Sequence, residues 1–330
     1  MTYNTVFYSK IMNHKLSVAP MLDWTDKHCR FLHRLISKDV LLYSEMITTP
    51  AILQGDTQKY IGFNSSEHPV VLQLGGSNAK ELAKSCVIAQ EFGYDEVNLN
   101  VGCPSDRVQK GRFGACLMNE PNLVAECIQT MMNSVDIPIT VKSRIGVDNN
   151  DSFENLQAFV KVLADTGMRT LIIHARKALL KGLSPKQNRS VPPLNYDFVY
   201  RIKQLFPELT IVINGGINSL KEAQTHLKQV DGVMLGRAIW NNPWILHELQ
   251  NQLFNRKSEN SRDKVLQKYI QYCKFELEKG VKLHWLLPPV LNLYHGLPGN
   301  KKWKSHLVTQ APRRDKDLSV FEEARGFIVE

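Results

Sequence analysis

The sequence has no apolar stretch long enough to form a membrane-spanning helix. The longest candidate, residues 285–291, is short and contains two prolines. The first fifteen residues mix polar side chains with two lysines and lack the apolar core of a secretory signal peptide. These absences predict a cytoplasmic protein with no membrane partner.

The chain also lacks paired cysteines. Its six cysteines, at positions 29, 86, 103, 116, 127 and 273, form no C-x-x-C pair, and most of them lie within apolar periodic segments. In a chain of 330 residues this pattern argues against a disulfide framework and against a zinc site. We therefore expect reduced thiols and no metal.

A third absence concerns nucleotide binding. No G-x-G-x-x-G turn follows any of the apolar runs, which argues against the open dinucleotide-binding sheet. What the sequence does have is a net charge of +9, which by itself suggests only a polyanionic partner or a basic isoelectric point.

Eight short runs rich in Val, Ile and Leu recur along the first 235 residues, and each ends in polar or glycine residues. The expected strands are Leu16–Leu22, Val40–Ile47, Val70–Gly75, Glu96–Val101, Ile139–Ile145, Thr170–Ala175, Thr210–Asn214 and Gly232–Leu235. Continuous apolar strands of this kind indicate a parallel sheet that is covered on both faces.

Segments with helical periodicity separate these runs, and several begin with Asn, Asp or Ser as N-caps. The clearest are Thr25–Ile36, Ala79–Phe92, Leu123–Val135, Phe153–Thr166, Tyr196–Phe206 and Ser219–Gln229. Only the second connection, around 49–62, looks irregular. Eight such units predict an α/β fold, a (β/α)₈ TIM barrel; an open doubly wound sheet is the alternative.

The pattern changes after residue 244. Four further segments are helix-like, with no apolar strand run among them: Ile245–Phe254, Asp263–Lys279, Lys282–Leu297 and Leu318–Val329. We therefore expect a catalytic barrel over residues 1–245 and a small all-helical domain over 246–330, attached through the polar segment 255–261. Basic clusters at Lys301, Lys302 and Lys304, with Trp303 between them, and at Arg313–Arg314 suggest a nucleic-acid surface; a solvated helical face is the alternative.

The chemistry of a TIM barrel lies at the carboxyl ends of its strands. The fourth strand delivers Asn100 and Cys103 into a turn made by Gly102 and Pro104, a setting that suits a reactive thiol. A buried packing role is the alternative for a single cysteine. Polar residues stand at the same end of nearly every strand, which packing alone does not explain.

Two strand ends suggest a phosphate site. Asn214, Gly215 and Gly216 precede one helix and Gly236–Arg237 precede the next, so small residues can bring backbone N–H groups close to an anion. Loops seven and eight are the usual phosphate site of this fold. Gln73 and Lys142 lie deeper and could meet the polar edge of a planar ring.

In chain order these motifs resemble those of the tRNA-dihydrouridine synthases. The matching segments are Ala19–Met21, Asn98–Pro104, Val141–Arg144, Ile173–Arg176, Asn214–Gly216 and Gly236–Arg237. The stretch 175–189, followed by 192–194, resembles the bacterial A subgroup, which reduces uridines at positions 20 and 20a of the tRNA D-loop.

The resemblance implies tightly bound flavin mononucleotide (FMN) and transient reduction by NADPH. It implies that a hydride passes from FMN to C6 of a uracil and that Cys103 protonates C5, since thiols are protonated near neutral pH. The implied flavin contacts are Pro20, Met21, Gln73, Lys142, His174, Asn214, Gly215, Gly216, Gly236 and Arg237. The implied tRNA contacts are Asn100 and Arg176, and we add Lys186, Arg189, Lys301, Lys302 and Lys304 because of their charge and position.

Two other functions stay open at this point. One is a flavin barrel acting on a free pyrimidine, as in dihydroorotate dehydrogenases, and the other is a non-catalytic tRNA-binding protein. The sequence indicates no protein partner, and we expect a monomer. It does not give the nucleotide modified without the resemblance, the choice of NADPH over NADH, or the preferred tRNA species.

Overall fold

The structure is a computed structural model, described here for residues 12–313 and 317–329. Arg314, one of the basic residues noted in the tail, and residues 1–11, which were inspected for a signal peptide, lie outside the described residues. Among the described residues, none of the helices combines the length and apolar character that crossing a membrane requires.

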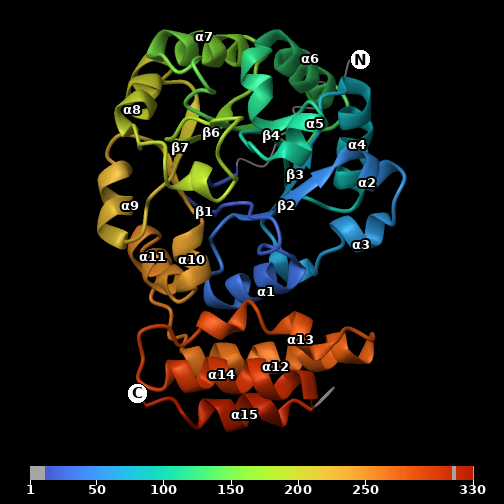
Figure 1. Cartoon of the computed structure of the whole chain (residues 1–330), viewed down its shortest axis with the longest axis vertical. Helices are drawn as coiled ribbons and strands as arrows, with labels where there is room; N and C mark the ends of the chain where they lie inside the picture. The colour runs from blue at the N-terminus through green and yellow to red at the C-terminus, as the bar shows by residue number, and fades with distance from the viewer. Residues whose placement is uncertain (1–11, 314–316, 330) are drawn as a thin grey trace, which may run out of the picture.

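Eight parallel strands form one closed barrel at the centre of the larger part of the molecule (Figure 1). They are β1 (Leu16–Val18), β2 (Leu42–Thr48), β3 (Val70–Gly75), β4 (Glu96–Val101), β5 (Ile139–Arg144), β6 (Thr170–His174), β7 (Thr210–Asn214) and β8 (Gly232–Leu235). The sheet runs β1-β8-β7-β6-β5-β4-β3-β2, and a parallel bridge between Ser17 and Leu41 joins its two ends. The predicted TIM barrel is confirmed, and the open-sheet alternative is excluded by this closure.

Helices surround the barrel as the 3.6-residue periodicity predicted. They include α1 (Lys27–Ile36), α4 (Ala79–Glu91), α6 (Pro121–Met132), α7 (Phe153–Ala164), α8 (Tyr196–Leu205), α9 (Leu220–His226) and α10 (Arg237–Asn241). Side chains of Asn78, Ser152 and Ser219 cap α4, α7 and α9 by accepting backbone N–H groups, as expected of N-cap residues.

The connection expected to be irregular, 49–62, instead contains two short helices. α2 (Thr49–Leu53) and α3 (Thr57–Ile61) are only five residues each, too short to produce a readable helical period. Pro50 stands in the first turn of α2, and the Asp56 side chain caps α3. The sequence of this segment therefore contains helix-start signals, although the helices are too short to show a helical period. After β4 come α5 (Asp106–Lys110) and the 3₁₀ helix η2 (Gly114–Asn119).

The barrel interior contains an apolar cluster and a group of polar side chains, and both are buried. One side is apolar, with Tyr43, Val71, Ile172, Val212 and Met234 in a single buried cluster. The other side, along β3 to β5, is polar and equally buried; its members are Gln73, Glu96, Asn98 and Thr140. Buried polar groups need hydrogen-bond partners, so this side of the barrel must be internally bonded.

Figure 1 shows α11 (Ile245–Leu253) beside α10 in the barrel part of the molecule. The remaining helices form a tail next to the barrel: α12 (Arg262–Glu278), α13 (Leu283–Leu286), α14 (Asn300–Gln310) and α15 (Ser319–Arg325). The all-helical tail is as expected, but α14 was not predicted and 282–297 is not one helix: it contains α13 and a 3₁₀ turn at Val290–Asn292. Pro288 and Pro289 prevent a continuous helix there.

Contacts with α1 attach the tail to the barrel. Phe31 on α1 stacks on Tyr272 of α12, with ring centroids 3.9 Å apart, and His28 Nδ1 lies 2.7 Å from the Tyr272 hydroxyl. Lys27 pairs with Glu276 at 2.9 Å. α11 also contacts α1, α9 and β1, so this helix packs on the barrel although it lies beyond residue 245. The division into two domains remains a prediction.

Candidate active site

A cavity of about 1060 Å³ opens at the carboxyl ends of the strands. Most of the residues singled out from the sequence line it: Pro20, Met21, Gln73, Asn100, Cys103, Lys142, His174, Arg189, Asn214, Gly215, Gly216, Gly236 and Arg237. Arg176, Lys186 and the tail lysines are not part of its lining. Residues from all eight strand ends therefore converge on one site, the position where TIM barrels place their chemistry.

The Cys103 thiol is held by a turn that Asn100 organises. Asn100 Oδ1 accepts the backbone N–H groups of Gly102, at 3.1 Å, and Cys103, at 2.9 Å. The Cys103 carbonyl accepts the Ala115 N–H at 2.9 Å, and its Sγ lies 3.6 Å from the Ser105 hydroxyl. Cys103 is partly exposed to the cavity, whereas Cys29, Cys86, Cys127 and Cys273 are buried. All six cysteines are free thiols, as expected.

Lys142 and His174 face the cavity from β5 and β6. Burial and the neighbouring Arg144 lower the pKa of Lys142 to about 7, against a contribution from Cys103 that raises it. Burial, Arg144 and Lys142 lower the pKa of His174 well below its usual range, so its imidazole is neutral at pH 7. The Lys142 ammonium group makes no hydrogen bond or ion pair with any residue that the structure describes, whereas its backbone pairs with β4 and β6. An electron-rich ligand in the cavity would supply the partner that the protein does not.

The glycine turn after β7 allows close approach to the cavity. Gly215 and Gly216 have φ values of 117° and 72°, in the region that favours glycine. A Cβ on Gly215 would lie 2.7 Å from His174 Cδ2, and one on Gly216 would lie 2.6 Å from Leu194. The helices that follow the two phosphate-type turns are short, seven residues in α9 and five in α10. An anion at this place would therefore be bound mainly by the turn itself and by nearby cations, and less by a helix terminus.

Arg144 connects the Cys103 turn to the long loop after β6. Its guanidinium donates to the carbonyl oxygens of Gly102 at 2.8 Å and of Lys177 and Asn188 at 3.0 Å. Only 3% of Arg144 is exposed, and burial lowers its pKa to about 10. The sequence motif contained this arginine, but its role could not be assigned because its three acceptors are distant in sequence.

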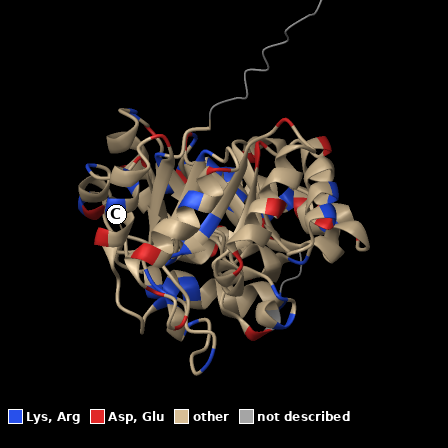
Figure 2. Ribbon diagram, turned by 90° about the horizontal axis from the view of Figure 1, so that it is seen from above, with Lys and Arg blue, Asp and Glu red and all other residues tan. Residues whose placement is uncertain are grey.

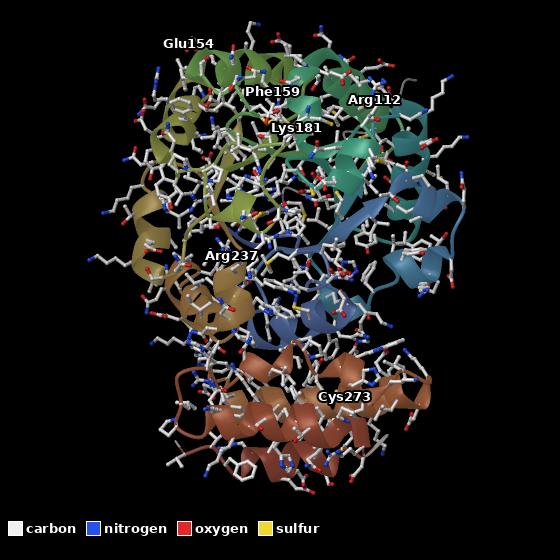
Figure 3. The ribbon with its side chains drawn as sticks, viewed as in Figure 1. Arg112, Glu154, Phe159, Lys181, Arg237 and Cys273 are labelled. Carbon is white, nitrogen blue, oxygen red and sulfur yellow. The ribbon has the colours of Figure 1, made fainter. Side chains whose placement is uncertain are left out.

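The loop itself carries three of the proposed tRNA-binding residues. Arg176 bonds the backbone carbonyls of Ser190 and Pro192, which holds the loop closed. Lys186 is exposed on the loop, outside the cavity. Arg189 lies at the cavity, where its carbonyl accepts a hydrogen bond from Arg237 at 2.9 Å. Figure 3 labels Arg237 on the barrel side of the molecule, above the tail. The arrangement leaves Arg189 and Lys186 available to a ligand and engages Arg176 within the protein.

The opposite wall of the cavity carries carboxylates that the sequence analysis missed. Glu45 on β2 accepts the backbone N–H of Asp23, whose φ of 64° is unusual for a residue other than glycine. Burial raises the pKa of Glu45. Beside them Trp24 stacks on Trp240, with centroids 4.7 Å apart and planes 9° from parallel. No spacing in the sequence indicates these pairings, since each joins two separate loops or strands.

None of the basic tail residues that the structure describes lines the cavity. Lys301 and Lys302 on α14 and Arg313 beyond it are exposed, and Lys304 is half-buried. Trp303, considered above as a surface aromatic, is fully buried, and its Nε1 donates to the Leu291 carbonyl at 3.2 Å. The suggestion of an exposed tryptophan among the lysines is therefore wrong, because the helix turns Trp303 inward between Tyr294 and Phe321.

Side chains of both signs occur around the described part of the barrel. Figure 2 shows Lys and Arg intermixed with Asp and Glu around the outside of the barrel. The concentration of cations at one wall of the cavity, formed by Lys142, Arg144, Arg189 and Arg237, is therefore a local feature of the site.

Comparison with known proteins agrees with this geometry. The profile of the family described as Dihydrouridine synthase (Dus) matches residues 17–324, nearly the whole chain. The tRNA-dihydrouridine(20/20a) synthase of Vibrio cholerae is 51% identical over 312 residues, which is 94% of this chain and 95% of the relative. The enzymes of the same name from Shewanella oneidensis and Shigella flexneri are 50% and 48% identical, over 98% and 96% of this chain and 97% and 94% of their own lengths.

Proposed function

Because the chain belongs to the dihydrouridine synthase family, we propose that it reduces the C5=C6 bond of uridines 20 and 20a in the D-loop of tRNA. The observation that carries the proposal is the meeting of Cys103, Lys142 and His174 at one cavity whose glycine turn can admit a phosphate. Identities near 50% to relatives with this specificity, over almost the full chain, support the choice of positions 20 and 20a.

The cavity suits FMN, the cofactor of this family. Lys142, without a protein partner among the described residues, and Gln73 would meet the polar edge of its ring system. Gly215, Gly216, Gly236 and Arg237 would hold its phosphate, since two of these glycines already adopt positive φ values. When bound, FMN reduced by NADPH supplies the hydride for C6 of the uracil.

Cys103 supplies the proton. Reduction of a conjugated C5=C6 bond develops negative charge at C5 and O4, so an acid must reach C5. Asn100 fixes the main chain at Cys103 and leaves the thiol facing the cavity. Neutral His174 and the cationic groups beside it can hold the uracil edge and a neighbouring phosphate. The target base must be turned out of the folded tRNA to enter, which takes a few kcal/mol that protein contacts offset.

We further propose that tRNA contacts both the cavity rim and the tail. Arg189 and Lys186 lie on the loop at the catalytic face, and Lys301 and Lys302 are exposed on α14. On this proposal the barrel binds the flavin and the target base, the tail binds the tRNA backbone, and the enzyme works as a cytoplasmic monomer.

Two measurements test the proposal. Supernatant of heat-denatured protein should show the absorption spectrum of free FMN, and NADPH oxidation should be coupled to dihydrouridine formation in transcript tRNA but not with free uridine. Activity on free uridine would favour an enzyme of free pyrimidines. Mapping of dihydrouridine at sites other than 20 and 20a would overturn the assigned positions, and flavin-free protein that reduces tRNA would overturn the cofactor.

A further inference from the structure

A continuous chain of hydrogen bonds crosses the barrel interior from the Cys103 turn to a buried carboxylate. Asn100 Nδ2 donates to Gln73 Oε1 at 2.9 Å, and Gln73 Nε2 donates to Asn98 Oδ1 at 2.8 Å. Asn98 Nδ2 then donates to the Thr140 hydroxyl at 3.0 Å. The chain ends where Thr140 Oγ1 donates to Glu96 Oε1 at 2.7 Å.

Solvent has almost no access to this chain. Glu96 and Asn98 are 0% exposed, Gln73 and Thr140 are 1% exposed, and Asn100 is 8% exposed. His14 Nε2 lies 3.0 Å from the second oxygen of Glu96, on the side away from the cavity. Because water cannot readily replace a lost partner, each member depends on its neighbours for satisfaction.

All the hydrogen bonds of the chain run in one direction. At the cavity end the N–H groups of Gly102 and Cys103 require an acceptor, so Asn100 must present Oδ1 to them and Nδ2 to Gln73. At the other end the Thr140 hydroxyl donates to Glu96 Oε1, so only its lone pairs remain to meet Asn98, which must present Nδ2 to it. The two ends demand the same orientation of all three amides between them.

We propose that Thr140 and Glu96 are positioning residues that fix the amide orientations of Asn100 and Gln73 and thereby the turn that presents Cys103. Neither residue lines the cavity. If the chain is broken at Thr140, Asn98 and Gln73 can rotate, and a rotated Gln73 turns its Nε2 donor toward Asn100 Nδ2. Asn100 then loses its acceptor; it either rotates, which presents Nδ2 to the two N–H donors of the turn, or moves away from the turn. The turn would then lose both hydrogen bonds, although its covalent sequence is unchanged.

The consequence for activity rests on the proposed function, but the consequence for the turn does not. Loss of the fixed Asn100 orientation loosens residues 100–103, and Gln73 no longer presents one fixed atom to a ligand in the cavity. Exchange of the Gly102 and Cys103 amide hydrogens and alkylation of Cys103 by iodoacetamide can be measured with neither flavin nor tRNA.

The test compares Thr140→Val with Thr140→Ser in the full-length protein. Valine keeps the shape and removes the hydroxyl, whereas serine keeps the hydroxyl and removes a methyl group. Positioning through the chain predicts that only Thr140→Val speeds exchange at Gly102 and Cys103, with β7 as internal reference. It also predicts that only this variant speeds Cys103 alkylation, by about ten- to thirtyfold, the order expected when the turn loses its two hydrogen bonds to Asn100. It also predicts weaker FMN retention and slower tRNA reduction in that variant, with Thr140→Ser close to the unaltered protein.

A packing role predicts the reverse, with Thr140→Ser the more damaged variant or with faster exchange spread evenly over the barrel, and either result would overturn the inference. If Thr140→Val does not fold, Asn98→Leu breaks the same chain one bond nearer to the cavity and must show the same local change. If Thr140→Val speeds exchange at residues 100–103 while the unaltered protein neither retains FMN nor modifies tRNA, the positioning role is supported and the proposed function is refuted. Unchanged exchange in Thr140→Val, with an unaltered protein that binds FMN and modifies tRNA, would do the opposite.

Discussion

Basic side chains at the cavity rim and in the helical tail differ in their burial. At the rim Lys142 and Arg144 are drawn into the barrel, where burial lowers both pKa values, and Arg144 is bonded to three backbone carbonyls. In the tail Lys301 and Lys302 project into solvent, while the residue between them and Lys304, Trp303, fills the core. A basic group that the fold keeps buried despite the cost of desolvation is a candidate for binding or catalysis, whereas an exposed basic group indicates at most a surface contact.

The two regions also differ in how well the sequence alone predicts where their basic side chains lie. The rim residues stand at fixed positions relative to strand ends, so the barrel fold itself determines that they face one cavity. The tail lysines were selected from composition, which does not specify the side of a helix. The following four predictions use this contrast, beginning with the largest effect.

Replacing Cys103 with alanine should slow uracil reduction by about two to four orders of magnitude, the usual contribution of a general acid. FMN content and NADPH oxidation should change little, because the thiol is not needed for either. Quantifying dihydrouridine in tRNA over time measures the effect. Cys116→Ala is the matched control, since Cys116 is also partly exposed but lies outside the cavity lining. An unaltered rate in Cys103→Ala would assign the acid to another group.

Replacing Gly215 with alanine should weaken FMN retention by about ten- to a hundredfold, as expected from 1–3 kcal/mol of backbone strain and the clash with His174. Gly93→Ala separates the two causes. Gly93 also has a positive φ, 91°, but a Cβ there meets nothing within 4 Å. Titration of apoprotein with FMN gives the affinities. Equal retention in Gly215→Ala and the parent protein would remove this turn from the phosphate site.

Replacing Lys142 with methionine should change the pH dependence of stability. The pKa of Lys142 is about 7 in the folded protein, below its ordinary value of 10.5, so between these values the unfolded chain binds the proton more readily. The free energy of unfolding of the FMN-free parent should therefore rise with pH from about 7 to 10, relative to Lys142→Met, by about 1–3 kcal/mol.

Urea unfolding of both FMN-free proteins at several pH values measures this difference. Lys301→Met is the control, because Lys301 is solvent-exposed. A difference between the parent and Lys142→Met that does not depend on pH would contradict the buried-amine interpretation.

The smallest effect is expected in the tail. Replacing Lys301, Lys302 and Lys304 together with glutamine should weaken tRNA binding by about three- to tenfold and lower the slope of log affinity against log salt by up to about three units, one per phosphate contact. FMN content and NADPH oxidation should stay constant. The triple change of Lys80 and Lys84 on α4 and Lys228 in the turn after α9, all exposed on the outside of the barrel, matches the loss of charge. If both triple variants bind tRNA alike, the tail lysines are only a solvated face.

The sequence by itself determined the order of the strands and of the longer barrel helices, and it placed most of the residues singled out for function at the cavity. Apolar strand runs, helical periods and capping residues are local signals, and the barrel then places every strand's carboxyl end at one rim. For this reason the sequence alone predicts that Cys103, Lys142, His174 and Gly215 lie at one cavity. The same reasoning could not find α2 and α3, which are shorter than the period that would indicate them.

Only the tertiary structure decided which side chains meet across separate strands. The bond between Glu45 and Asp23, the burial of Trp303 and the chain from Asn100 to Glu96 join residues on different elements, and the bonds of Arg176 join distant positions of one loop. Register and packing bring these groups together. Because burial leaves each polar group only the partners that the fold provides, their roles follow from three-dimensional contacts and not from spacing along the chain.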